Sequence, residues 1–255
     1  DDQVDVLVIP RREAGRPFQS GEMLMLDSVL SFAGQIISNS ELHERLQRMS
    51  FEVTRALVAA IDQKDHYTSG HSERVGLLSR MTGEELGLGP DELQTLEWAG
   101  LLHDVGKIGV PEEILNKPGK LTDEEFEIIK RHPRAGWEIL RPIVSFEGVL
   151  DAVLHHHEAP DGSGYPDGLK GDTPSLFARI VHVVDIFDAL TSNRSYRAPF
   201  SYEQALDIIR KDAGTKVDPH VAAAFERMLE RLRREQPERF ASLTSGRQEP
   251  SHGNA

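Results

Sequence analysis

Residues 178–190 read ARIVHVVDIFDAL, with apolar side chains at nearly every position of a helix. A helix that is apolar all round belongs in a protein interior, so this segment predicts a buried helix. It carries Asp185, an ionised carboxylate that is costly to bury unless a cation compensates it. Residues 98–104, WAGLLHD, are also mostly apolar, so burial of Asp104 would carry the same cost. The sequence therefore predicts two buried carboxylates that face positive charge.

Helical patterns separated by Gly and Pro surround these two segments. They cover residues 72–86, 90–102, 123–131, 148–157, 176–190, 202–211 and 219–234. Pro90 suits the first turn of its helix, and Thr122 and Glu125 have the spacing of a capping box. The Gly- and Pro-rich loop over 159–175 is too long for a plain connection, so we expect it to carry function. The predicted fold class is all-α.

The first 63 residues have a different pattern. Residues 4–9, VDVLVI, predict a β-strand that is followed by a loop and by a helix over about 22–63. Apolar residues recur in this helix at spacings of four and three: Leu42, Leu46, Met49, Val53, Ala56 and Ala60. This heptad pattern suits a two-stranded coiled coil and equally an amphipathic helix that lies on its own domain. Because the sequence begins with Asp1 and shows no signal-peptide pattern, we expect it to be part of a longer protein.

Composition excludes several classes of function. The 255 residues include 29 Lys and Arg against 42 Asp and Glu, a net charge of −13 that argues against binding of long nucleic acid. A small phosphate ligand held by a few local cations remains compatible. No apolar run approaches the length of a membrane span, so we expect no membrane contact in this fragment and a cytoplasmic location. With no Cys in the chain, any metal must be bound by His, carboxylate and water.

Eight of the 11 histidines fall between positions 66 and 182, several of them beside carboxylates. Each has an ordinary explanation: His71 can cap a helix, His132 precedes a Pro where a helix is expected to stop, and the run 155–157 can be a surface feature. Lys107 and Arg179 are candidate salt-bridge partners for the buried carboxylates. A metal cluster explains more of the pattern, with Asp104 bridging two ions about 3.5–4 Å apart.

Six motifs in this order resemble the HD-GYP phosphodiesterases, a branch of the HD metal-dependent phosphohydrolases. They are HYTSGH at 66–71, LLHDVGKIGVP at 101–111, KRHP at 130–133, HHEAPDGSGYP at 156–166, RIVHVVDIFDALTSNRSYR at 179–197 and FSYEQAL at 200–206. The order of strand, loop and helix before them resembles the end of a GAF sensory domain. The resemblance implies an HD-type helical bundle with an added GYP loop and C-terminal helices, preceded by a long signalling helix and a short strand remnant. The implied domains are a GAF-like remnant and linker at 1–45, the HD-GYP domain at 46–235 and a disordered tail at 236–255.

The resemblance also implies the site residues. The metal ligands would be His71, His103, Asp104, His132, His156, His157 and Asp185, with Asp104 bridging and His155 left as a spare. Asp104 and Lys107 would be catalytic, Gly164, Tyr165 and Pro166 would shape the substrate loop, and Arg194 and Arg197 would bind phosphate or guanine. Related proteins with three metals carry Glu where this chain has Tyr67, so we expect two divalent ions. Fe or Mn is favoured, and Zn, Co and Ni are also compatible.

The implied activity is hydrolysis of the bacterial second messenger cyclic di-GMP to linear pGpG and, in many family members, onward to GMP. One alternative is a cyclic-dinucleotide receptor with little turnover that signals through its helical stalk. Another is a phosphohydrolase of the wider HD class, which lacks the GYP element. We also expect a homodimer that pairs through the N-terminal helix.

Overall fold

The computed structural model describes residues 19–64, 70–193 and 198–244, and most of these residues are helical. A single β-bridge joins Ala213 to Val217 within them. The all-α fold class is therefore confirmed, whereas the strand predicted at 4–9 lies outside the described residues. The chain divides into a smaller unit, Asp1–Val53, and a larger unit, Thr54–Ala255.

The helices follow the sequence pattern closely. In chain order they are α1 (Ser20–Asp62), α2 (His71–Glu85), α3 (Pro90–Leu102), η1 (Val105–Gly109), α4 (Glu112–Leu115), α5 (Asp123–Ile129), α6 (His132–Leu140), η2 (Val144–Val149), α7 (Leu150–His155), α8 (Leu176–Thr191), α9 (Tyr202–Asp212), α10 (Pro219–Glu235) and α11 (Pro237–Thr244). The predicted capping box opens α5, since Thr122 Oγ1 accepts from Glu125 N at 3.3 Å and Thr122 N donates to the Glu125 carboxylate at 2.8 Å. Five elements were not predicted from the sequence: η1, α4, α6, η2 and α11.

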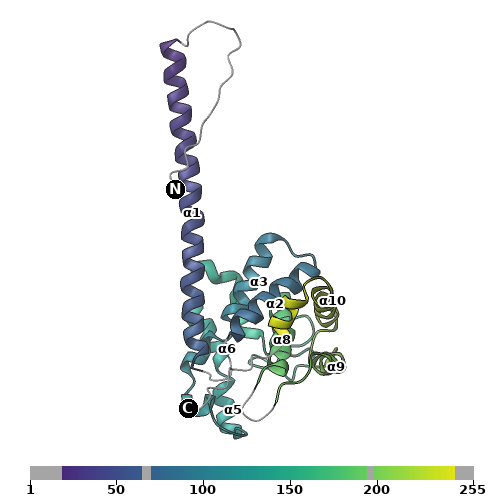
Figure 1. Cartoon of the computed structure of the whole chain (residues 1–255). Helices are drawn as coiled ribbons and strands as arrows, with labels where there is room; N and C mark the ends of the chain where they lie inside the picture. The colour runs from purple at the N-terminus through teal and green to yellow at the C-terminus, as the bar shows by residue number, and fades with distance from the viewer. Residues whose placement is uncertain (1–18, 65–69, 194–197, 245–255) are drawn as a thin grey trace, which may run out of the picture. The chain divides into compact units, whose positions relative to one another are not determined.

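Helix α8 is the centre of the larger unit. It packs against α2, α3, α7, α9 and α10, and Figure 1 shows α2, α8 and α10 side by side. Ile180, Val183 and Phe187 of α8 have no exposed surface, and the Phe187 ring meets Phe225 of α10 edge to face at 5.0 Å. Each such buried side chain contributes about 1.5–3 kcal/mol, so the segment that is apolar all round holds the bundle together.

Two helices lie where the sequence pattern predicts none. The helix expected to stop before Pro133 does stop, because α5 ends at Ile129, but His132 then begins α6, with Pro133 in the first turn, where a missing N–H leaves no hydrogen bond unmade. The disordered tail expected over 236–255 includes helix α11 over Pro237–Thr244, and residues 245–255 lie outside the described residues. Two apolar residues of this otherwise polar segment pack against the domain: the Phe240 ring contacts Tyr202 at 5.0 Å, and Leu243 is buried.

The heptad stripe of α1 is exposed. Leu42, Leu46, Met49 and Val53 are 50–55% exposed, and Ala56 and Ala60 are exposed as well. Val58, on another side of the helix, is only 4% exposed. Within the larger unit, the covered face at the end of α1 therefore carries Val58 and not Ala56 or Ala60. Among these residues no helix combines the length and apolar character required to cross a membrane.

Candidate metal centre

Six elements bring His and Asp side chains to one place in the larger unit. His71 begins α2, His103 follows α3, Asp104 precedes η1 and His132 begins α6. They form two groups of potential ligands whose donor atoms lie within 4.8 Å of one another. The first donor cluster is His71, His103 and Asp104, and the second donor cluster is Asp104, His132, His156 and His157. Asp104 is the residue that the two clusters share.

The two carboxylate oxygens of Asp104 face different clusters. Its Oδ2 lies 3.3 Å from His103 Nε2 and 3.6 Å from His71 Nε2, whereas its Oδ1 lies 3.2 Å from His132 Nε2. Asp185 adjoins the first cluster, with Oδ1 at 3.3 Å from His71 Nε2 and 3.9 Å from His103 Nε2. A carboxylate placed in this way can supply one oxygen to each of two neighbouring ions.

Backbone carbonyls fix the orientation of three rings. The Nδ1–H groups of His103, His132 and His156 donate to the carbonyl oxygens of Gly100 at 2.7 Å, Ile129 at 2.8 Å and Val153 at 2.9 Å. This bond keeps the proton on Nδ1 and leaves a lone pair on Nε2, the tautomer that binds metal. The Nε2 atoms then face one another at 3.3 Å between His71 and His103 and at 3.3 Å between His132 and His156. Facing lone pairs repel unless a cation or a proton lies between them, so the donor set fits divalent metal ions.

Electrostatics differ between the two clusters. Burial disfavours the charged form of His71, but hydrogen bonds to Asp104, Asp185 and Asp188 outweigh this and raise its pKa well above its ordinary value. Burial and the neighbouring histidines hold the pKa values of His156 and His157 well below the ordinary range. Burial would raise the pKa of Asp104, yet His103, Lys107 and the hydrogen bonds of the site hold it well below normal. His156 and His157 are thus neutral and ready to bind a metal ion, whereas at His71 a metal ion must compete with a proton.

The loop after α7 covers one side of the second cluster. Gly164 lies so close to the backbone that a Cβ would fall 2.4 Å from both Ala159 N and His157 O, so no larger residue fits. The amide of Tyr165 donates to His157 O at 3.1 Å, and the Tyr165 ring lies over the His157 ring at 4.6 Å. The peptide bond between Tyr165 and Pro166 is cis. The predicted GYP loop therefore contacts a predicted ligand directly.

Other sequence-predicted residues have distinct positions. Lys107 Nζ lies 2.6 Å from Asp104 Oδ2, so it pairs with the shared carboxylate. Arg179 is not a partner of the site, because it pairs with Asp172 at 3.0 Å and with Asp218. His155 bonds Asp151 at 2.7 Å and Asp167 at 3.2 Å, away from both clusters. Tyr67, Arg194 and Arg197 lie outside the described residues, so their predicted roles stay predictions.

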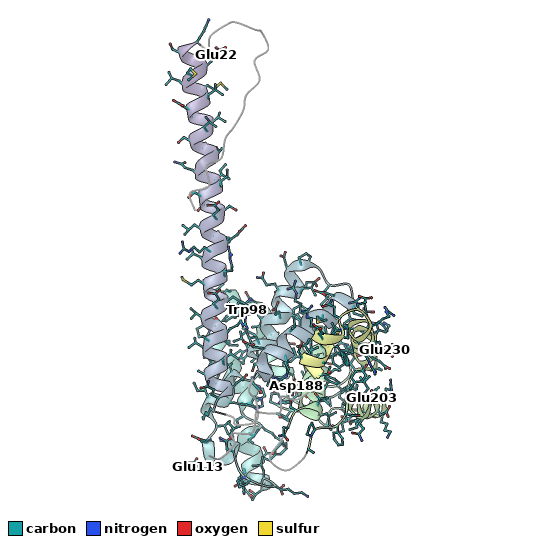
Figure 2. The ribbon with its side chains drawn as sticks, in the orientation of Figure 1. Glu22, Trp98, Glu113, Asp188, Glu203 and Glu230 are labelled. Atoms are coloured by element: carbon teal, nitrogen blue, oxygen red, sulfur yellow. The ribbon has the colours of Figure 1, made fainter. Side chains whose placement is uncertain are left out.

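Sequence reasoning missed Asp188, which lies within the helical bundle (Figure 2) and is 1% exposed. Its Oδ2 accepts from His71 Nδ1 at 2.7 Å, and Arg74 binds both of its oxygens at 2.6 and 3.0 Å. The signal was present, since the argument that singled out Asp185 applies equally three residues later. Asp188 orients His71 as the carbonyls orient the other rings.

Glu158 was missed as well. It is 4% exposed, and its carboxylate accepts from the backbone N–H groups of Asp167 at 2.7 Å, Gly168 at 3.1 Å and Leu169 at 3.0 Å. These bonds hold the GYP loop against the end of α7. Glu158 directly follows the predicted ligand His157. The sequence pattern therefore does not show whether the Glu158 carboxylate binds a metal ion or the backbone.

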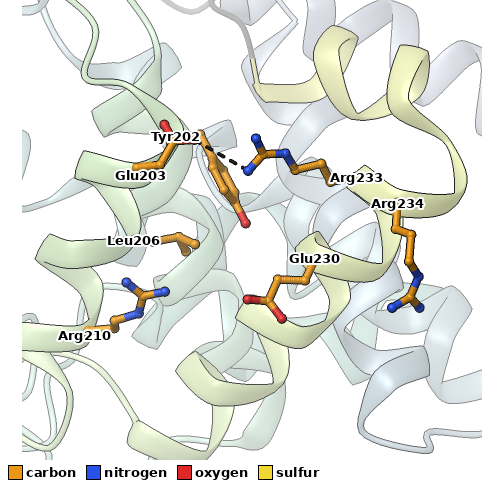
Figure 3. A pocket seen from close by; sticks show the side chains of 7 residues that line it. All are labelled: Tyr202, Glu203, Leu206, Arg210, Glu230, Arg233 and Arg234. Carbon is orange, nitrogen blue, oxygen red and sulfur yellow. Dashed lines mark ion pairs between the residues drawn. The ribbon is translucent and has the colours of Figure 1, made fainter.

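A separate cavity of about 530 Å³ lies between α9 and α10, where Tyr202, Glu203 and Glu230 line it (Figure 3). Its arginines are balanced by carboxylates: Arg233 pairs with Glu203 at 3.5 Å, and Arg210 pairs with Glu226. None of the predicted site residues that the structure describes lines it. The metal-ligating chemistry is gathered around Asp104 instead.

Comparisons with known proteins agree with this geometry. The chain is 38% identical over 234 residues to a cyclic di-GMP phosphodiesterase response regulator of Xanthomonas campestris, covering 88% of this chain and 61% of that protein. It is 39% identical to a cyclic di-GMP phosphodiesterase of Thermotoga maritima, covering 79% and 56%, and 38% identical to a 3'3'-cGAMP-specific phosphodiesterase of Vibrio cholerae, covering 75% and 41%. The chain thus spans less than two thirds of the length of these relatives.

Solved structures share the fold. A cyclic GMP-AMP phosphodiesterase of V. cholerae superposes with a TM-score of 0.58 at 21% identity, covering 76% of this chain and 50% of that one. An HD domain of a Listeria monocytogenes phosphodiesterase in complex with cyclic di-AMP superposes with a TM-score of 0.51 at 19% identity, covering 70% and 95%. The family profile described as HD domain matches residues 55–221, which include both donor clusters, and the chain therefore belongs to the HD domain family.

Proposed function

We propose that this chain is a metal-dependent phosphodiesterase that hydrolyses cyclic di-GMP to pGpG and onward to GMP. The observation that carries the proposal is the position of Asp104, which presents one oxygen to each of two histidine clusters. The names of the relatives support the substrate class, since those quoted above are phosphodiesterases of cyclic di-GMP or 3'3'-cGAMP.

Two divalent ions, Fe or Mn, would be held by the residues described above. His71, His103 and Asp185 would bind one, His132, His156 and His157 the other, and Asp104 both. Bound ions of this kind activate water near neutral pH and polarise a phosphodiester. No protein nucleophile is required.

The chain's own residues would position these parts. Lys107 holds the shared carboxylate and places an ammonium group beside it, where it can attract the phosphate of an incoming dinucleotide. The hydrogen bonds to Nδ1 keep the rings from turning, so the Nε2 atoms need no reorganisation. Tyr165 covers His157 and limits access of bulk water on that side. Arg194 and Arg197 would bind the phosphate or guanine groups of the substrate.

A product assay tests the proposal. The purified chain, loaded with Mn²⁺ or Fe²⁺, is incubated with cyclic di-GMP, and the nucleotides are separated by chromatography. We expect pGpG and then GMP from the wild type and neither from Asp104→Ala, with Asp172→Ala as a matched control on the exposed Asp172. Tight binding without products would instead support the receptor alternative. A parallel reaction with 3'3'-cGAMP separates the two substrate classes found among the relatives.

We further propose that residues 46–235 form the catalytic domain and that α1 pairs with a second copy of itself. The exposed side chains of Leu42, Leu46, Met49 and Val53 support the pairing, because a continuous apolar stripe left in water is unfavourable. Light scattering on the full chain and on a chain that begins near Phe51 tests it. Equal monomeric masses for both would contradict the pairing.

A further inference from the structure

The end of α1 is bonded to the segments that carry the donor clusters. Asp62, the last residue of α1, is 6% exposed, and its carboxylate accepts from Ser72 Oγ at 2.7 Å and from Ser72 N at 3.3 Å. Ser72 directly follows His71, which belongs to the first donor cluster. The last turn of α1 is thus tied to the first turn of α2 next to a predicted ligand.

Lys64, two residues after Asp62, is hydrogen-bonded to the end of η1. Its ammonium donates to the carbonyl oxygens of Ile108 at 2.8 Å and Val110 at 2.6 Å, which lie at the end of η1. The carbonyl oxygen of Lys64 itself accepts from Asn116 Nδ2 at 2.8 Å. Both the side-chain ammonium and the backbone carbonyl of Lys64 are therefore hydrogen-bonded.

The short helix η1 connects Lys64 to the shared carboxylate. Asp104 precedes η1, the Lys107 amide donates to Asp104 O at 2.9 Å, and the Lys107 ammonium lies 2.6 Å from Asp104 Oδ2. An element of five residues has few hydrogen bonds of its own. Its position therefore depends on outside contacts, and Lys64 supplies two of them to carbonyls that lie beyond Lys107.

We propose that Asp62 and Lys64 are positioning residues through which the end of α1 sets the relative placement of His71 and Asp104. Asp62 holds the helix that begins with His71, and Lys64 holds the helix that follows Asp104. Because α1 is one helix from Ser20, a rotation or shift of its last turn displaces both bonds together. The proposal rests on the metal centre described above and identifies where a change in α1 reaches it.

Two measurements on the full chain test this proposal. The first is Mn²⁺ affinity by titration calorimetry, and the second is amide hydrogen exchange of residues 103–110 in the metal-free protein. Lys64→Met removes the ammonium and keeps an apolar stem, and we expect affinity to fall about threefold to tenfold, below the loss for groups that bond a ligand directly. Exchange at 107–110 should rise, and Lys64→Arg should restore much of both properties. Asp62→Ala removes the second connection and should also weaken Mn²⁺ binding.

Lys117→Met is the matched control, because the Lys117 ammonium pairs with the Glu125 carboxylate of α5. It should leave both measurements unchanged. Mn²⁺ affinity within twofold of wild type together with unchanged exchange at 107–110 in Lys64→Met would overturn the proposal. Both measurements are independent of catalysis, so a wild type that binds Mn²⁺ without hydrolysing cyclic di-GMP would refute the proposed function while leaving this inference testable.

Discussion

Replacing Asp188 by Asn should weaken metal binding without altering the shape of the site. In the native chain the carboxylate accepts from His71 Nδ1 at 2.7 Å and binds Arg74 at 2.6 and 3.0 Å. An Asn side chain has one acceptor oxygen in place of the two carboxylate oxygens. Arg74 can only donate hydrogen bonds, so this oxygen must face Arg74. The amide NH₂ then faces His71, so Nδ1 must become an acceptor and the ring proton moves to Nε2. That proton occupies the lone pair required for a metal ion.

The expected loss of Mn²⁺ affinity is about 10–100-fold, the usual effect of removing a group that orients a metal-binding histidine, or about 1.4–2.7 kcal/mol. Titration calorimetry at pH 7 measures it, with Asp172→Asn as control because Asp172 is an exposed partner of Arg179. An Asp188→Asn variant that binds Mn²⁺ within twofold of wild type would refute the reasoning about the tautomer.

The Asp188 carboxylate also makes the free energy of unfolding of the metal-free protein depend on pH. Burial raises the pKa of Asp188, but His71 and Arg74 outweigh burial and lower it to about 2. The unfolded value is about 3.9, so the ionised group contributes about 2 kcal/mol of stability above pH ~4, and this contribution is lost as the pH falls towards ~2. Denaturant unfolding of wild type should show this loss between pH ~4 and ~2. The Asp188→Asn variant should lack it, and equal pH dependence of the two proteins would contradict the assignment.

Three further predictions concern the donor clusters. Gly106→Ala should lower the free energy of unfolding by about 1–3 kcal/mol, measured by denaturant titration, because a Cβ would lie 1.9 Å from His132 O and force η1 away from α6. His156→Ala should abolish Mn²⁺ binding at the second cluster whereas His155→Ala should not, and equal losses of metal content by mass spectrometry would contradict the placement of these rings. Filling the first cluster should release protons, because the pKa of His71 is raised, and its affinity should increase with pH up to that pKa. Calorimetry in buffers of different ionisation enthalpy should detect no comparable release from the second cluster, where the pKa values of His156 and His157 are lowered.

Much of the fold was predictable because its signals are local. The apolar pattern of residues 178–190 predicts α8 and its burial, and Thr122 with Glu125 predicts the start of α5. The start of α6 was not predictable from Pro133 alone, because the same residue can end one helix or open the next. Helix α11 depends on contacts of Phe240 and Leu243 with distant residues, which a polar segment does not reveal.

The candidate site divides in the same way. His71, His103 and Asp104 could be named as ligands from the sequence because the motifs that contain them resemble those of the HD-GYP phosphodiesterases. The sequence marks Asp188 as a second buried carboxylate of the same helix, but the roles of Asp188 and Glu158 follow from which groups they face: His71 in one case and backbone amides in the other. Lys64 is an ordinary lysine in the sequence, and only the fold brings it to the carbonyls of η1.

The most direct test of the central claim is an anomalous-scattering crystal structure of the Mn²⁺-loaded chain. The account predicts two manganese peaks about 3.5–4 Å apart, each bonded to a different oxygen of Asp104. It also predicts His71 and His103 on one ion and His132, His156 and His157 on the other. A single peak, or an Asp104 carboxylate more than about 4 Å from both ions, would contradict it.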